Sequence, residues 1–108
     1  MFKRQYRLPS GIRIASQPTI STPLFFLKKG ANQLSLSRFG FLVSKKVDNS
    51  AVIRNRTRRV IRSIIEDLFP NIQTGFDLLF ILKKPIEKRT KELEDEVEQT
   101  LRKAQLMI

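Results

Sequence analysis

Five arginines lie within the nine residues from Arg54 to Arg62, which read Arg-Asn-Arg-Thr-Arg-Arg-Val-Ile-Arg. A guanidinium group is always charged and matches phosphate oxygens with paired hydrogen bonds, so a dense row of them is typical of polyanion binding. No acidic residue lies between Ala51 and Ile65 to neutralise this row. The segment therefore predicts phosphate binding as its chemistry.

A helical periodicity separates most of these arginines from an apolar face. At about 100° per residue, one side of the helix carries a stripe formed by Arg54, Asn55, Arg58, Arg59 and Arg62. Arg56 lies at the edge of the opposite side, whose members are Ile53, Thr57, Val60, Ile61, Ile64 and Leu68. We therefore expect an amphipathic helix over residues 51–69, with an N-cap within residues 48–50 and a stop at Pro70.

The overall charge supports a polyanionic partner. The 108-residue chain has 21 basic and 10 acidic side chains, a net charge of +11. Residues 1–86 hold 16 basic and 4 acidic side chains, whereas residues 87–108 hold 5 and 6. The positive field belongs to the body of a single small domain, which points to nucleic acid.

Several absences limit the chemistry of the chain. It contains no Cys and no His, so the common metal ligands and the usual general base are missing. Glu66 and Asp67 are adjacent on the predicted helix and point about 100° apart, which does not suit one metal site. No apolar run approaches the roughly 18–20 residues of a membrane span. We expect a cytoplasmic protein with no catalytic residue, protein-bound metal or membrane partner.

The remaining pattern predicts a small α+β fold. Residues 24–29, 39–46 and 76–82 have the composition of strands, and residues 90–104 form a second amphipathic helix that buries Leu93, Val97, Leu101 and Ala104. Residues 1–20 form a basic arm, partly disordered or containing a short helical turn at 12–15. The segment 76–82 is almost continuously apolar, so we expect it to be covered on both faces.

Aromatic and basic residues adjoin one another on the predicted strands. Phe25 or Phe26 and Phe41 lie close in sequence to Lys28, Lys45 and Lys46. Aromatic rings beside lysines on a sheet can stack unpaired bases, although each ring can equally belong to the core. Ser44, Lys45 and Lys46 precede the N-terminus of the arginine helix, a favourable corner for a phosphate.

Two consecutive motifs resemble the bacterial ribonuclease P protein component. The first is Phe39-Gly40-Phe41-Leu42-Val43-Ser44-Lys45-Lys46, and the second is Arg54-Asn55-Arg56-Thr57-Arg58-Arg59-Val60-Ile61-Arg62. The resemblance implies one α+β domain over residues 1–108, in the order α-β-β-(β)-α-β-α, with a mixed sheet and a left-handed βαβ crossover through the arginine helix.

The resemblance also implies a function. The family binds a catalytic ribonuclease P RNA, which cleaves the 5′ leader from precursor tRNA with Mg²⁺, and no further protein is required. By position, the residues that contact this RNA are Arg54, Asn55, Arg56, Arg58, Arg59 and Arg62. The expected leader groove combines the family positions Ser44, Lys45 and Lys46 with our aromatic candidates Phe25, Phe26, Phe41 and the neighbouring Lys28.

The chain departs from the family pattern at three places. Ser63 replaces the usual Glu or Gln, and Arg58 replaces a lysine. The stretch Gly11–Ser21 is shorter than the first helix of the family and lacks its pair of aromatic residues.

A generic RNA-binding or ribosome-associated module is the alternative function. A metal-dependent nuclease fits poorly, as does a DNA-binding helix-turn-helix, since residues 71–75 lead into a strand.

Overall fold

The computed structural model describes residues 3–9, 14 and 20–108. Its elements, in chain order, are η1 (Arg4–Tyr6), β1 (Ile20–Ser21), β2 (Phe25–Ala31), β3 (Arg38–Leu42), α1 (Ala51–Leu68), η2 (Phe69–Asn71), β4 (Phe76–Leu82) and α2 (Lys91–Lys103). The predicted α+β class is confirmed. The helical turn predicted at 12–15 and most of the predicted arm lie outside the described residues.

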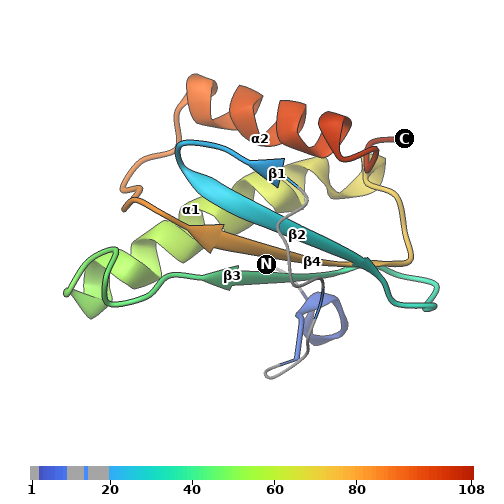
Figure 1. Cartoon of the computed structure of the whole chain (residues 1–108), viewed down its shortest axis with the longest axis horizontal. Coiled ribbons are helices and arrows are strands. Elements are labelled where there is room, and N and C mark those ends of the chain that lie inside the picture. Colours follow the sequence, from blue (N-terminus) through green and yellow to red (C-terminus); the bar gives the residue numbers. More distant parts are fainter. Residues whose placement is uncertain (1–2, 10–13, 15–19) are drawn as a thin grey trace.

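The four strands form one mixed sheet in the order β1-β2-β4-β3. β2 pairs antiparallel with β1 and β4, whereas β3 pairs with β4 in parallel. β4 is therefore an interior strand and β3 an edge strand. Helices α1 and α2 cover the same face of the sheet (Figure 1), and we call the opposite side the open face.

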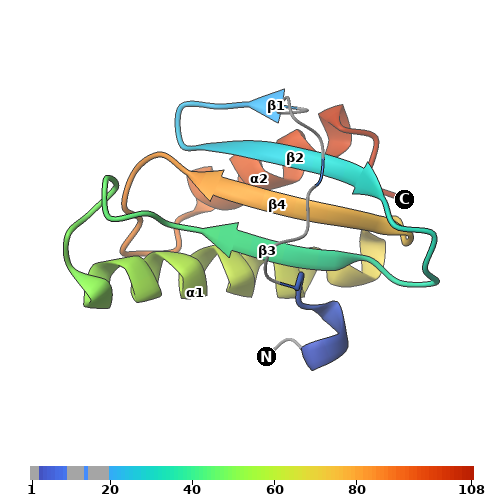
Figure 2. The ribbon, with the colours of Figure 1, turned by 60° about the horizontal axis from the view of Figure 1, so that its bottom comes forward.

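The chain passes from β3 to its parallel neighbour β4 through α1. Seen from the open face, both strands run to the left, α1 lies behind the sheet and the chain re-enters above β3 (Figure 2). This crossover is left-handed, as the family resemblance implies, although about 98% of such connections are right-handed. It places α1 behind the β3 edge of the sheet.

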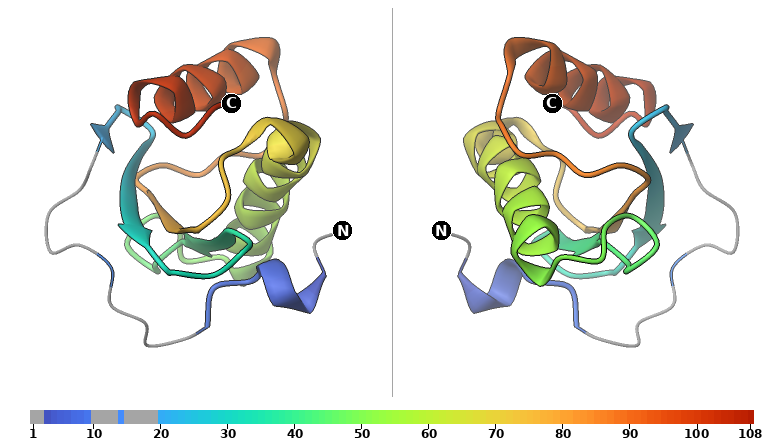
Figure 3. Two further views of the ribbon diagram at one scale, coloured as in Figure 1. Left: turned by 90° about the vertical axis from the view of Figure 1, so that its right-hand side faces the viewer. Right: turned by 90° about the vertical axis from the view of Figure 1, so that its left-hand side faces the viewer.

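The core lies between the sheet and the two helices, as the side views show (Figure 3). Phe25 of β2 and Phe80 of β4 are fully buried there, with ring centroids 5.3 Å apart. On the open face of β4, however, Leu79 and Ile81 are only half-buried. We expected β4 to be covered on both faces. It is fully covered on the face that packs against the helices and only partly covered on the open face.

Helix α1 matches its predicted bounds closely. Ser50 is the N-cap, and its hydroxyl accepts a hydrogen bond from the backbone N–H of Ile53. The buried residues of the helix are Thr57, Ile61, Ile64 and Ile65. Ile65 was not among the predicted apolar positions. The buried face is thus rotated toward Ile65, which leaves Ile53, Val60 and Leu68 half-buried at its margins.

A buried hydroxyl fixes α1 against the loop that follows β4. The side-chain oxygen of Thr57, which has no exposed surface, accepts a hydrogen bond from the Ile86 N–H at 2.9 Å. It donates to the carbonyl of Ile53, one turn earlier, at 2.9 Å. Both bonds satisfy a polar group that would otherwise be buried at a cost, so they define the position of the helix along the sheet.

The strand predicted over residues 39–46 is shorter in the structure. Its pairing with β4 ends at Leu42 opposite Ile81, one residue before β4 itself ends. Without a partner strand the chain turns, and the Val47 N–H donates to the Ser44 carbonyl at 3.0 Å. Ser44, Lys45 and Lys46 therefore belong to the β3–α1 loop.

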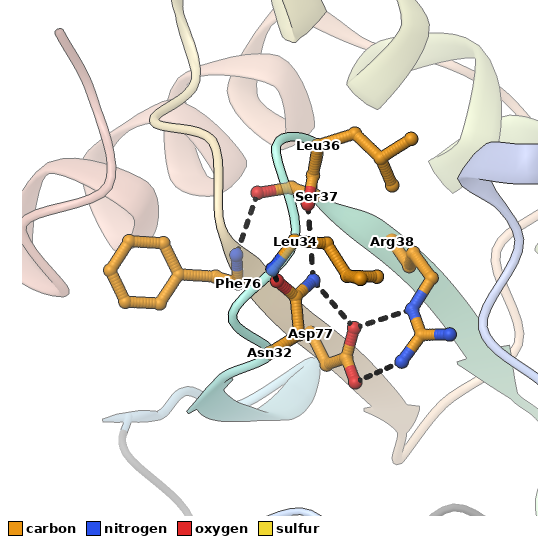
Figure 4. A network of polar contacts seen from close by, with 7 residues as sticks. All are labelled: Asn32, Leu34, Leu36, Ser37, Arg38, Phe76 and Asp77. Atoms are coloured by element: carbon orange, nitrogen blue, oxygen red, sulfur yellow. Dashed lines mark hydrogen bonds and ion pairs between the residues drawn. The ribbon is translucent and has the colours of Figure 1, made fainter.

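An ion pair on the open face ties the β2–β3 connection to β4 (Figure 4). Asp77, 6% exposed, accepts hydrogen bonds from Nε and Nη2 of Arg38, both at 2.8 Å, and from the side chain of Asn32 at 3.0 Å. Burial by itself raises the pKa of Asp77, but the Arg38 and Asn32 hydrogen bonds and the Arg38 charge outweigh it. The pKa therefore lies below its usual value.

We predict that Asp77→Asn lowers the free energy of unfolding by about 2–4 kcal/mol at pH 7, because Arg38 loses its buried carboxylate partner. A depressed pKa contributes stability that is present above about pH 4 and is lost as the pH falls through the folded-state pKa. The difference between wild type and variant, measured by denaturant unfolding, should therefore shrink at pH 3.

Asp95→Asn is the matched control, since Asp95 is exposed on α2 and lies 3.9 Å from Lys91. It should change the free energy of unfolding by less than about 0.5 kcal/mol. An equal loss for Asp77→Asn at both pH values would show that charge pairing is not the cause.

Candidate nucleic-acid interface

The predicted arginine stripe divides into two groups in the structure. Asn55, Arg58, Arg59 and Arg62 together line a hollow on the outer surface of α1. Within it, Arg58 donates a hydrogen bond to the side-chain oxygen of Asn55. Among the described residues, none of these arginines forms an ion pair with a carboxylate. The hollow is therefore a concentration of positive charge without an internal counter-charge.

Arg62 is the most constrained member of the hollow. Its guanidinium carbon lies 5.9 Å from the centroid of the Phe41 ring, a cation–π arrangement across to β3. Burial lowers the pKa of Arg62, as do the charges of Arg7, Arg58 and Arg59, against an opposing effect of Glu66. An anion bound here would relieve the repulsion between these cations.

Arg54 is turned toward the β3–α1 loop. Its Nη1 atom donates to the carbonyls of Asp48 and Asn49, each at 2.9 Å. The Asp48 carboxylate in turn accepts from the Ser50 N–H at 2.8 Å. Arg54 therefore holds together the loop that carries Lys45 and Lys46, in addition to any contact with a partner.

Arg56 points away from the hollow, as its place at the edge of the apolar face suggested. It pairs with Glu87 of the β4–α2 loop at 3.0 Å, and both side chains are about half exposed. An exposed pair of this kind contributes only about 0–1 kcal/mol and is easily exchanged for another anion. In the free protein, however, the carboxylate of Glu87 already balances the charge of Arg56.

The two neighbouring phenylalanines of β2 point to opposite faces. Phe25 is fully buried in the core, so its inclusion in the leader groove is wrong. Phe26 lies on the open face, where Lys83 Nζ sits 4.0 Å from its ring centroid. Pairing of Phe26 with Ile81, and of Ile81 with Leu42, forms an apolar row across three strands of this face.

Lys83 is a residue that the sequence did not single out. Besides covering Phe26, its Nζ donates to the Ser21 hydroxyl at 2.9 Å and to the Thr22 carbonyl at 2.5 Å. Its backbone N–H also donates to the Leu24 carbonyl at 2.8 Å. Only the pairing of β2 with β4 brings these residues together, and no local pattern reports that pairing.

The predicted leader residues do not form one groove. Phe26 and Lys28 share the open face, since they alternate with the buried Phe25 and Leu27. Phe41 instead stacks on Phe80, at 5.6 Å, on the helix side of the sheet. Ser44, Lys45 and Lys46 lie in the loop beyond the end of β3. The set is thus distributed over both faces and one end of the sheet.

The described residues also bear on metal and membrane binding. In residues 3–9, 14 and 20–108, no three His, Cys, Asp or Glu side chains come together in a group that could hold a metal ion. None of the helices in this part of the chain has the length and apolar character needed to cross a bilayer.

A family model described as Ribonuclease P matches residues 2–105. The chain belongs to this family. A ribonuclease P protein component from Chloroflexus aurantiacus is 33% identical, and the match covers 97% of this chain and 82% of that relative. Another from a Synechococcus strain is 44% identical over 67% of this chain, but the match spans only 55% of that relative.

The fold agrees with this assignment. The solved structure of the Staphylococcus aureus RNase P protein superposes with a TM-score of 0.69 at 25% identity, covering 82% of each chain. The resemblance that the two sequence motifs predicted is therefore confirmed, together with the mixed sheet and its two covering helices.

We predict that Arg58 and Arg56 contribute unequally to RNA binding. Arg58→Gln should lower the log–log salt slope for binding to ribonuclease P RNA by roughly 0.7–0.9, the value for one phosphate contact. Arg56→Gln should lower it less, because Glu87 already balances Arg56. Filter binding over a range of KCl concentrations measures both slopes, and equal losses would contradict the distinction between Arg56 and the arginines of the hollow.

We also predict opposite behaviour of the two β2 phenylalanines. Phe25→Ala should lower the free energy of unfolding by about 3–5 kcal/mol, because it leaves a cavity in the core. Phe26→Ala should cost far less stability but weaken binding of single-stranded RNA by about 1–3 kcal/mol per stacked base. Denaturant unfolding and titration with a labelled oligouridine separate the two effects; unchanged affinity of Phe26→Ala would remove this ring from RNA binding.

Proposed function

We propose that this chain is the protein subunit of a ribonuclease P and assists removal of the 5′ leader from precursor tRNA. The observation that carries the proposal is the hollow of Asn55, Arg58, Arg59 and Arg62 on α1, in a chain of this family. Its guanidinium groups have the geometry and charge to bind phosphates, and the described residues offer no catalytic constellation beside them.

The chemistry of cleavage belongs, in this proposal, to the RNA subunit with its Mg²⁺ ions. The protein would reduce phosphate repulsion between catalytic RNA and substrate, since its net charge is +11 and residues 1–86 hold 16 basic against 4 acidic side chains. This division of labour is supported by the lack of His and Cys and by the absence of a carboxylate cluster in the described residues.

The leader would lie on two surfaces, one beside the N-terminus of α1 and one on the opposite, open face of the sheet. The β3–α1 loop offers Lys45 and Lys46 beside the helix, and the open face offers the apolar row through Phe26 with Lys28 and Lys83 at its margin. Both surfaces suit a single strand that is bound through phosphates and base faces, without readout of base edges.

We expect cleavage of a 5′-extended precursor tRNA at low Mg²⁺ to require both components. The assay compares the protein alone, ribonuclease P RNA alone and the two together, and maps the product to the mature 5′ end. A variant with Arg58→Gln and Arg62→Gln should lose most of the stimulation by protein.

Arg102→Gln serves as the control, because Arg102 lies on α2 and approaches Glu98 at 3.9 Å. It should stimulate cleavage like the wild type. Cleavage by the protein alone would refute the division of labour. Binding of RNA without stimulated cleavage would instead favour a generic RNA-binding module.

A further inference from the structure

Within residues 3–9, Arg7 and Leu8 dock on the free edge of β3. The Leu8 N–H donates to the Phe39 carbonyl at 2.9 Å, and Arg7 forms a parallel β-bridge with Phe39. Next to this bridge the Tyr6 ring packs against Phe69, with centroids 4.7 Å apart. Figure 2 shows this segment beside β3 at the end of α1. The edge strand β3 thus gains a short second partner on the side away from β4.

The lack of a side chain at Gly40 leaves the space in which Leu8 packs on β3. A Cβ atom built at Gly40 would lie 3.1 Å from Leu8 Cδ2 and 3.2 Å from Leu8 Cβ, and 3.1 Å from Leu79 Cδ1. These separations are shorter than ordinary van der Waals contacts, so Leu8 can rest on β3 in this way because residue 40 lacks a side chain. The glycine of the first sequence motif therefore has a packing role at this edge.

The position of Leu8 fixes the direction of Arg7. The backbone of Arg7 is extended, with φ −92° and ψ 134°, and successive side chains of an extended chain point to opposite sides. Leu8 packs over Gly40 on the open face, so Arg7 is directed toward the side where α1 lies. Its side chain is exposed there.

The electrostatics agree with this geometry. After burial, the charge of Arg7 is the largest influence that lowers the pKa of Arg62, ahead of Arg58 and Arg59. Arg62 also lies over the ring of Phe41, two residues along β3 from the bridge to Arg7. Charges from two distant parts of the sequence therefore converge at the β3 edge.

We propose that Arg7 completes the hollow of Asn55, Arg58, Arg59 and Arg62 as one composite site for the phosphodiester backbone of RNA. The inference rests on the proposed function in that its ligand is RNA. It adds a contact from outside α1 and extends the RNA-binding surface around the edge of the sheet. Among the described residues none of the four arginines forms an ion pair with a carboxylate, so an external anion is the available counter-charge.

The test measures the salt dependence of binding to in-vitro-transcribed ribonuclease P RNA. Arg7→Gln should lower the log–log slope by roughly 0.7–0.9, as Arg58→Gln does. Arg7 is exposed, so the variant should unfold at the same denaturant concentration as the wild type. An unchanged slope for Arg7→Gln beside a lowered slope for Arg58→Gln would overturn this inference alone. Unchanged slopes for both would overturn the proposed interface itself.

A second variant tests the docking without removing a charge. An added Cβ at residue 40 already lies 3.1 Å from Leu8, and the branched side chain of Gly40→Val reaches further into the space of Leu8. This variant should displace Leu8 and thereby reproduce the slope of Arg7→Gln, although Arg7 is still present. Combining Gly40→Val with Arg7→Gln should lower the slope no further. A wild-type slope in Gly40→Val, with circular dichroism showing an intact fold, would show that docking on β3 does not position Arg7.

Discussion

The structure depends on one constraint: α1 must stay folded while it carries five arginines, none of which forms an ion pair with a carboxylate of the same helix. Like charges at spacings of four residues cost a few tenths of a kcal/mol each. Full burial of one isoleucine contributes about 1.5–3 kcal/mol, and Ile61, Ile64 and Ile65 are all buried against the sheet. Burial therefore outweighs the repulsion, and the helix can keep its charges available. The Thr57 hydroxyl, bonded to the Ile86 N–H, then fixes where along the sheet those charges stand.

That constraint explains why the arginines have different roles. Those of the hollow line the outer surface of α1, with Arg62 reaching the Phe41 ring, whereas Arg54 and Arg56 contact neighbouring loops. There the backbone carbonyls of Asp48 and Asn49 and the carboxylate of Glu87 are within reach. Two of the five arginines in the motif thus have partners within the protein, so a simple count of guanidinium groups overstates the number available to bind an anion.

The sequence predicted those features that are set locally. The apolar period, the N-cap candidates at residues 48–50 and Pro70 predicted α1, with Ser50 as the cap in the structure, and the periodic residues from Leu93 to Ala104 predicted α2. Features that depend on which strands pair, and in which register, could not be predicted from the sequence. Only the register of β2 with β4 decides that Phe25 is buried and Phe26 exposed, and that Lys83 covers Phe26. Arg7 was missed for the same reason, since its place depends on a contact with β3 some thirty residues later in the sequence.

Charge is also segregated between the two helices, although both cover one face of the sheet. Exposed or half-exposed acids follow one another along α2 (Glu92, Glu94, Asp95, Glu96 and Glu98), whereas the hollow of α1 is purely basic. Lys29 bonds the Ala104 carbonyl at 2.8 Å and so ties the end of α2 to β2, on the far side of β4 from β3. A polyanion is therefore attracted at the β3 edge and repelled at α2. Because such fields act before contact, this separation of charge would favour the approach of a polyanion from the β3 edge.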